Sequence, residues 1–316
     1  MTRSDQTIHI PVMLQEVVDA LHVSEAGVYV DGTFGGGGYS RAILQRKTCE
    51  VHAIDRDNDA IKRAEDLKTE YPGCFEIRHG NFGDMDKLYP ELLGRVNGIA
   101  LDIGPSSFQL DETERGFSFR LDAPLDMRMD TSSGETAADV VNTYDPASLL
   151  RILFDYGEER YAKRIVRKII EAREIKPIQT TTELAELIRS AYPYKKDTID
   201  PATKTFQALR IHVNKELEAL EKGLNASLKL LGNAGRLVVV TFHSLEDRLV
   251  KRFFALKSGK KDQQISRHML INHEKKNTEE LKIITKSPIC PSDHEVLTNR
   301  RSRSAKMRVA ERIIKE

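Results

Sequence analysis

The sequence predicts an α/β protein, a Rossmann-like and mostly parallel sheet into which an all-helical domain is inserted. Short apolar runs alternate with polar stretches of helical character in the first hundred residues, which is typical of right-handed βαβ units. From about residue 137 to about residue 231 only amphipathic helical periodicity is visible. A strand pattern then returns, so we expect the sheet to close after the insertion.

Four apolar runs define the first part of the predicted sheet. They are residues 28–30, 51–54, 75–77 and 98–103, and polar helical stretches separate the first three. A helical run at 39–45 follows the first strand. Because helices connect these strands, we expect them to be parallel.

Helix start signals support the insertion. Thr180-Thr181-Thr182-Glu183 supplies capping residues before a periodic run with Leu184, Leu187 and Ile188. Asp200-Pro201 similarly begins a helix, with proline near its first position.

The strand pattern resumes at 235–242 and is followed by a helical run at 245–256. Two further strands are predicted at 281–286 and 305–309, the second from alternation of apolar and basic residues. The polar stretch at 257–280 is predicted to be a mobile surface loop.

Composition fits a soluble, cytoplasmic enzyme. The chain has 316 residues, of which 40% are hydrophobic, and its mean hydropathy is −0.44. We expect no membrane span, because no apolar run approaches the length that one needs. We expect no secretory signal, because residues 1–21 carry scattered charges and lack an apolar core. Three distant cysteines predict a reducing compartment, and Cys290 with His294 lacks the second half of a metal site, so no metal is expected.

The glycine-rich stretch at 31–40, Asp-Gly-Thr-Phe-Gly-Gly-Gly-Gly-Tyr-Ser, is the most informative feature of the chain. It follows the first strand, and glycines there allow a sharp turn and close approach of a ligand. Asp55 ends the second strand about 20 residues further on, where an acid accepts hydrogen bonds from ribose hydroxyls. These features predict a cofactor that contains adenosine.

The details of the loop favour S-adenosylmethionine over NAD. Counting from Gly35 and Gly37, Ser40 stands where a dinucleotide motif has its third glycine, and no P-loop lysine follows. Asp31 would repel a pyrophosphate but attract a sulfonium or an ammonium group. The alternative, a merely flexible turn, leaves Asp31 and Asp55 unexplained.

Residues that follow the other strands are further site candidates, because ligands bind at the carboxyl ends of parallel strands. Phe82 follows the third strand, either as a ring that stacks on adenine or as ordinary core packing. The loop at 102–109 follows the fourth, with Ser106 and Ser107 as catalytic candidates or as helix caps. His243 follows the fifth, as a proton acceptor or a structural histidine.

Two basic clusters stand out against a net charge of +1. The first, at 299–308, we interpret as a nucleic-acid contact. For the second, at 160–168, we slightly favour a solvated helix face whose charges pair with Glu158, Glu159 and Glu171 over a phosphate-binding surface.

The chain resembles the ribosomal RNA small-subunit methyltransferase H family, the MraW-like cytosine-N4 methyltransferases that act on bacterial 16S rRNA. The most specific stretches are Asp-Met-Arg-Met-Asp at 126–130 and Phe-His-Ser-Leu-Glu-Asp-Arg at 242–248. The matching stretches together are 9–14, 31–40, 53–57, 101–104, 106–107, 109–111, 114–119, 124–130, 156–160, 205–210, 242–248 and 301–304.

The resemblance implies a class I methyltransferase sheet domain at 1–112 and 216–316, and a helical substrate-recognition domain at 113–215. It implies S-adenosylmethionine as donor, and as acceptor a cytidine in the decoding region of small-subunit ribosomal RNA. The exposed insertion also offers a surface for a homodimer. The cofactor residues carried over are Gly37, Gly38, Tyr39, Asp55, Phe82, Asp102 and Gln109. Many members have histidine at the position of Tyr39 and a small aliphatic residue at that of Pro105.

The expected reaction is direct in-line methyl transfer without a covalent intermediate. We expect the Asp102 loop to accept the proton of the cytosine amino group, with Ser106 or Ser107 assisting and His243 as the second candidate. The family pattern assigns Asp102 to the cofactor, so the two roles compete. Two groups of alternatives stay open. The first is a methyltransferase that acts on a protein or a small molecule. The second is a protein without methyltransferase activity, either an RNA-binding protein whose cofactor site has decayed or an NAD enzyme.

Overall fold

The computed structural model describes residues 11–193, 200–259 and 279–315. The chain divides into two compact units, which we describe separately. The sheet unit comprises Met1–Gly104 and Leu217–Glu316, and the helical unit comprises Pro105–Glu216.

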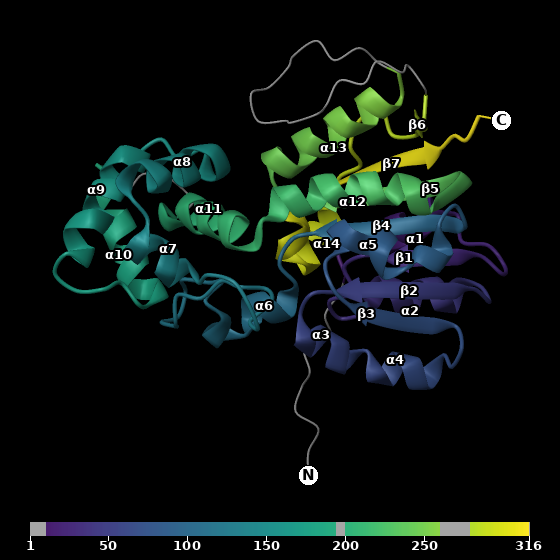
Figure 1. The fold of residues 1–316 in the computed structure, drawn as a ribbon, viewed down its shortest axis with the longest axis horizontal. Coiled ribbons are helices and arrows are strands. Elements are labelled where there is room, and N and C mark those ends of the chain that lie inside the picture. Colours follow the sequence, from purple (N-terminus) through teal and green to yellow (C-terminus); the bar gives the residue numbers. More distant parts are fainter. Residues whose placement is uncertain (1–10, 194–199, 260–278, 316) are drawn as a thin grey trace. The chain divides into compact units, whose positions relative to one another are not determined.

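The sheet unit is built on a seven-stranded sheet with the order β3-β2-β1-β4-β5-β7-β6 (Figure 1). The strands are β1 Val28–Asp31, β2 Glu50–Asp55, β3 Phe75–His79, β4 Val96–Ile103, β5 Leu231–Thr241, β6 Leu281–Ile283 and β7 Lys306–Arg312. The first five are parallel, and β7 runs antiparallel to β5 and β6. Every strand expected from the sequence is present, and the α/β fold class is confirmed.

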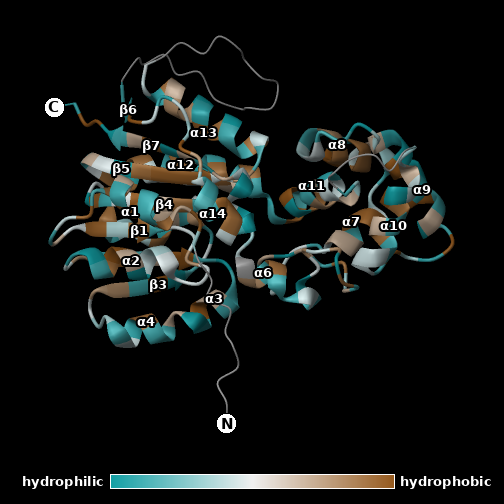
Figure 2. Cartoon of the chain, turned by 180° about the vertical axis from the view of Figure 1, so that it is seen from behind, coloured by the Kyte–Doolittle hydropathy of each residue, from teal (hydrophilic) through white to brown (hydrophobic). Residues whose placement is uncertain are grey.

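Helices cover both faces of this sheet. They are α1 Leu14–Leu21, α2 Gly38–Arg46, α3 Asn58–Arg63, α4 Glu65–Glu70, α5 Met85–Leu88, α12 Glu216–Leu230, α13 Ser244–Lys257 and α14 Asp293–Thr298. The first four pack into one apolar core, and α5, α12 and α13 pack into the other. In Figure 2 the central strands are largely brown, whereas α4 and α13 show teal.

The strands read as continuous apolar runs because both of their faces are buried. All four residues of β1 are buried, for instance, with Tyr29 in one core and Val28 and Val30 in the other. Within the described part of the chain, no helix is long and apolar enough to cross a membrane. The predicted surface loop falls largely on residues 260–278, which lie outside the described residues.

The helical unit has its own apolar core. Its main helices are α7 Ala137–Thr143, α8 Pro146–Gly157, α9 Ala162–Arg173, α10 Thr181–Ala191 and α11 Ala202–Asn214, preceded by α6 Ser107–Asp111. Thr180 caps α10 in a reciprocal pair with Glu183, as expected. Asp200 accepts a hydrogen bond of 2.9 Å from the backbone of Ala202, where α11 begins.

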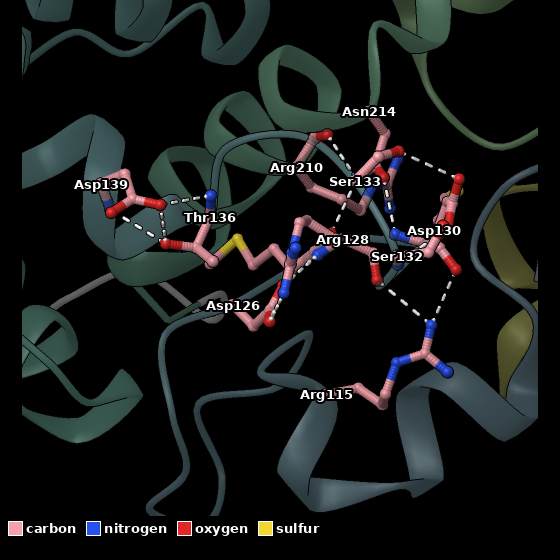
Figure 3. A network of polar contacts seen from close by, with 12 residues as sticks. Arg115, Asp126, Arg128, Asp130, Ser132, Ser133, Thr136, Asp139, Arg210 and Asn214 are labelled. Carbon is pink, nitrogen blue, oxygen red and sulfur yellow. Dashed lines mark hydrogen bonds and ion pairs between the residues drawn. The ribbon is translucent and has the colours of Figure 1, made fainter.

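The loop at residues 126–130 is held from several directions (Figure 3). Asn214 accepts a hydrogen bond from the Met129 backbone at 2.7 Å and donates to the Met127 carbonyl at 2.8 Å. Arg115 donates to the carbonyls of Arg128 and Met129 at 3.1 and 2.9 Å. These bonds hold Met127 at a φ of 64°, a conformation that costs a side-chain-bearing residue energy. The Asp-Met-Arg-Met-Asp stretch is thus a structural element of the helical unit.

Candidate cofactor site

The glycine loop connects β1 to α2 at the carboxyl end of the sheet. Gly35 and Gly37 have φ of 55° and 76°, in the left-handed region that favours glycine. A Cβ on Gly38 would lie 1.9 Å from Cγ of Pro11, so a side chain does not fit there without displacing the chain. The sequence therefore predicted correctly a tight turn at this place.

Asp31 lies beneath this loop and is fully buried. It accepts a hydrogen bond of 2.7 Å from the Ser40 hydroxyl and one of 3.2 Å from the Thr33 backbone. Burial raises the pKa of Asp31 to about 6 despite these bonds. The contact also explains why serine stands where a dinucleotide motif has glycine: Ser40 holds the buried carboxylate in place.

Asp55 ends β2 and ties the loop to that strand. Its two carboxylate oxygens accept hydrogen bonds from the backbone of Gly35 at 2.7 Å and of Asp57 at 2.8 Å. Burial raises the pKa of Asp55, although these bonds and the charge of Arg63 oppose the shift. The carboxylate is therefore fixed beside the loop, where the sequence predicts a ribose contact.

Phe82 follows β3 in a short 3-10 helix, Phe82–Asp84, and its side chain is half-buried. Its ring lies against Gly223 of α12, where a Cβ would come within 2.5 Å of a ring carbon. Core packing therefore accounts for part of this ring, and the adenine contact stays a prediction.

Asp102 lies on β4, next to β1, and its backbone donates to the Thr33 hydroxyl at 2.8 Å. Burial raises the pKa of its carboxyl group to about 7, and the charges of Asp31 and Glu246 add to the increase. The nearby Tyr39 hydroxyl acts in the opposite direction. The pKa of Asp102 thus lies close to neutrality.

Tyr39 is buried and uses its side chain, not only its backbone. The hydroxyl donates to the Val12 carbonyl at 2.5 Å, which fixes the segment before α1 to the start of α2. The sequence did not indicate this partner, because the two residues are 27 positions apart.

His243 comes directly before α13 and is largely buried beside Glu246. One Glu246 oxygen accepts hydrogen bonds from the backbone of Phe242 at 2.7 Å and of His243 at 3.2 Å. The other lies 2.9 Å from Nε2 of His243, yet neither ring nitrogen has a hydrogen-bond partner within the described part of the chain. Sequence analysis missed Glu246, although an acid at the third position of a helix is a recognised capping signal.

Three acids thus lie at the ends of neighbouring strands, Asp31, Asp55 and Asp102, and a fourth, Glu246, lies in the first turn of α13, which follows β5. Among the described residues, none of the first three forms an ion pair with lysine or arginine. Burial raises the pKa of each of these three carboxyl groups, so a positively charged ligand would hold them in the ionised form. A ligand with a positive charge and no phosphate fits this edge best.

Ser106 and Gln109 belong to the helical unit and bind each other. Gln109 donates its backbone N–H to the Ser106 hydroxyl at 3.2 Å, and the Ser106 backbone donates to the Gln109 side chain at 3.0 Å. This reciprocal pair caps α6, whose first residue is Ser107. The capping interpretation of Ser106 is confirmed, while the catalytic role of Ser106 and the cofactor role of Gln109 stay predictions.

The predicted nucleic-acid cluster at 299–308 has two parts. Arg308 is buried and pairs with Asp247 at 2.6 Å, with Lys306 3.8 Å from the same carboxylate, so this part is structural. Arg300, Arg301 and Arg303 are exposed on a 3-10 helix, Arg300–Ser304. The preceding helix, α14, contacts the segment before α1 through a 2.7 Å bond from the Met13 backbone to Glu295.

Comparison with known proteins identifies the family. The MraW methylase family model matches residues 6–313, nearly the whole chain. The chain belongs to this family. The resemblance inferred from the motifs is therefore confirmed, and so is S-adenosylmethionine as the cofactor, whose sulfonium and ammonium groups suit the acidic edge.

Relatives of similar length support the assignment. The protein named ribosomal RNA small subunit methyltransferase H in Paramagnetospirillum magneticum is 50% identical to this chain, over 96% of this chain and 95% of that protein. The protein of that name in Carboxydothermus hydrogenoformans is 47% identical, over 96% of this chain and 98% of its own. An rRNA methylase structure from Streptococcus thermophilus superposes with a TM-score of only 0.41 and 11% identity, over 96% of this chain and 99% of that one, which is too low to carry an argument.

Proposed function

We propose that this member of the MraW methylase family transfers a methyl group from S-adenosylmethionine to the exocyclic N4 of a cytidine in the decoding region of small-subunit ribosomal RNA. The observation that carries the proposal is the acidic edge of the sheet, with Asp102 at its centre. The names of the relatives, all small-subunit ribosomal RNA methyltransferases, support the acceptor. Ribosomes are assembled in the cytoplasm, which is the proposed location.

The proposed role of the glycine loop is to hold the cofactor. Gly37 and Gly38 give the ligand access to the backbone, Asp55 accepts hydrogen bonds from the ribose, and Phe82 contacts the adenine. Gln109 is proposed as a further contact from the helical unit. Asp31 contributes negative charge from below the loop rather than a direct contact, because it is fully buried.

The reaction needs alignment and one proton acceptor. The N4 lone pair forms a bond to the methyl carbon, the carbon–sulfur bond breaks, and S-adenosylhomocysteine leaves as a neutral thioether. N4 then loses one proton. Alignment of nitrogen, methyl and sulfur can supply about 7–11 kcal/mol of the barrier reduction.

Asp102 is the proposed proton acceptor, because a carboxyl group with a pKa of about 7 exchanges protons readily near neutral pH. His243 is the second candidate, with a ring that has no hydrogen-bond partner among the described residues. Ser106 is the third, and it would have to leave its capping position to assist.

The two roles of Asp102 can be separated by kinetics. If Asp102→Asn lowers kcat and leaves the affinity for S-adenosylmethionine unchanged, the carboxylate acts as the proton acceptor. If the affinity falls by the same factor as kcat/KM, the carboxylate binds the ammonium group of the cofactor. His243→Gln then tests whether His243 is the proton acceptor.

The direct test of function is transfer of a labelled methyl group to small ribosomal subunits from a strain that lacks this protein. Mass mapping of the RNA should find one N4-methylcytidine. Methylation of another atom would refute the assignment to N4. No incorporation into RNA, with tight cofactor binding, would leave the fold and cofactor intact and move the search to a protein or small-molecule acceptor.

A further inference from the structure

One exposed surface of the helical unit carries four cations in a row. Arg160, Lys163, Arg164 and Arg167, here called the α9 cationic face, recur at helical spacing and are all exposed. The opposite side of the helix, with Ala162, Ile165, Val166 and Ile169, is buried in the apolar core. The packing of α9 therefore directs these charges to solvent together.

The acidic residues expected to neutralise this face do so only in part. Glu159 is buried, and its carboxylate accepts hydrogen bonds from the Tyr192 hydroxyl and the Tyr161 backbone, each at 2.8 Å. Glu171 lies 3.6 Å from Arg167 in an exposed pair, and Glu158 is exposed directly after α8, so at most two acids face the four cations. Lys163 and Arg164 form no ion pair with any described residue. The face thus keeps a net positive charge.

Aromatic rings lie among these cations. Arg160 lies over the Tyr161 ring, with its guanidinium carbon 4.7 Å from the ring centroid, and donates to the Tyr161 hydroxyl at 2.8 Å. Arg164 lies 5.8 Å from the same centroid. Tyr192 supports the ring from another side in an edge contact of 4.5 Å.

The positions of the cations do not serve the helix itself. Lys163 and Arg164 stand in the first turn of α9, which contains no acidic residue. The positive end of the helix dipole lies there, so cations in this turn oppose the dipole and acids would complement it. Their charge is better explained by a partner than by the stability of α9.

We propose that the α9 cationic face is a docking surface for the phosphate backbone of RNA. The inference rests on the proposed function, which makes ribosomal RNA the substrate. Exposed arginine and lysine side chains bind phosphates and release counterions, and the Tyr161 ring among them offers a stacking surface for an unpaired base. The surface positions the RNA and does not select the target base.

The test is the charge reversal Lys163→Glu with Arg164→Glu, measured by filter binding of naked small-subunit ribosomal RNA at several salt concentrations. If each of the two cations contacts one phosphate of a single strand, the salt dependence becomes weaker: the negative slope of log K against log salt decreases in magnitude by about 1.4. The affinity at 0.1 M salt falls on the order of tenfold. The melting temperature should stay the same or rise, because the new acids complement the helix dipole. Loss of binding without loss of stability excludes misfolding.

A matched control is Lys251→Glu with Lys286→Glu, which changes the net charge equally. Both lysines are exposed on the sheet unit, and neither forms an ion pair with a described residue. This control should bind RNA nearly as tightly as the unaltered protein. Equal losses in both double variants would overturn the proposal, because net charge alone would then explain them.

The acceptor assay distinguishes this inference from the proposed function. If the unaltered protein binds RNA through this face but transfers no methyl group to it, the proposed function fails and the docking surface stands. If the reversal impairs transfer to assembled subunits but leaves binding of naked RNA unchanged, the face contacts a protein and the RNA assignment is overturned.

Discussion

Acidic residues behave in opposite ways at the cofactor edge of the sheet and in the loop at 126–130. At the edge, burial raises the pKa of Asp102 to about 7, and no described lysine or arginine pairs with it. In the loop, burial also acts to raise the pKa of Asp126, but two 2.8 Å hydrogen bonds from Arg128 lower it overall. The ion pair of Asp126 thus stabilises the loop, whereas the buried carboxyl group of Asp102, which has no described lysine or arginine partner, favours a cationic ligand.

The largest effect is expected for Asp55→Ala at the edge. The change removes the acceptor of two backbone hydrogen bonds and the proposed ribose contact, so affinity for S-adenosylmethionine should fall about a hundredfold or more. Isothermal titration calorimetry measures this directly. Unchanged affinity would refute the assignment of the site.

Asp126→Ala is the matched change in the loop and should have the reverse profile. The guanidinium of Arg128 loses its partner, and the free energy of unfolding should fall by about 1–2 kcal/mol in a urea titration. Affinity for the cofactor should stay within twofold. A variant that loses cofactor affinity while keeping its stability would contradict the distinction between the two regions.

Cofactor binding should depend on pH through Asp102. The sulfonium and ammonium groups favour the ionised carboxylate, so protons compete with the ligand below pH 7 and affinity should rise between pH 6 and 8 by up to about tenfold. Asp102→Asn should flatten this profile. A profile that keeps its slope in the variant would assign the pH dependence to another group.

The same raised pKa predicts the stability of the protein without cofactor. The folded state retains a proton on Asp102 that the unfolded state has already released, so the free energy of unfolding should fall as pH rises from about 4 to 7. Urea titrations of the unaltered protein and of Asp102→Asn, compared across this range, measure the contribution of this group. The sign is opposite to that of Asp126, whose lowered pKa makes its contribution disappear as pH falls.

The smallest effect is expected for Tyr39→Phe. It removes the hydrogen bond to the Val12 carbonyl and the contact with Asp102, at a cost of about 1 kcal/mol. Tyr39→His should keep a donor and lose less. Equal stability of both variants and the unaltered protein in thermal melts would show that the hydroxyl contributes nothing.

The elements of the fold that local patterns define were predictable from sequence. The strands were visible as apolar runs because both faces of the sheet are buried, and Thr180 and Glu183 were visible as a cap because their contact spans three residues. The pair of Ser106 and Gln109 has the same spacing. The sequence offered capping as one interpretation of Ser106, but it assigned Gln109 only a cofactor contact.

Contacts between distant segments were not predictable. Glu246 acts on Asp102 from a segment more than a hundred positions away, and only the parallel pairing of β4 with β5 brings the two together. The partner of Tyr39 and the strained conformation of Met127 likewise depend on packing that no local pattern encodes. Strands, turns and helix caps could therefore be predicted from sequence, whereas contacts between distant segments could not.

The pairing of β4 with β5 also has a consequence for biosynthesis. These strands are neighbours in the sheet, yet the whole helical unit, about 110 residues, lies between them in the chain. At 5–20 residues per second, a ribosome needs about 5–20 s to make that stretch. During this time β4 has emerged without the partner that will cover its edge, and an open strand edge invites association with other chains. Nascent chains that end within the helical unit are therefore expected to be the ones that most need a chaperone.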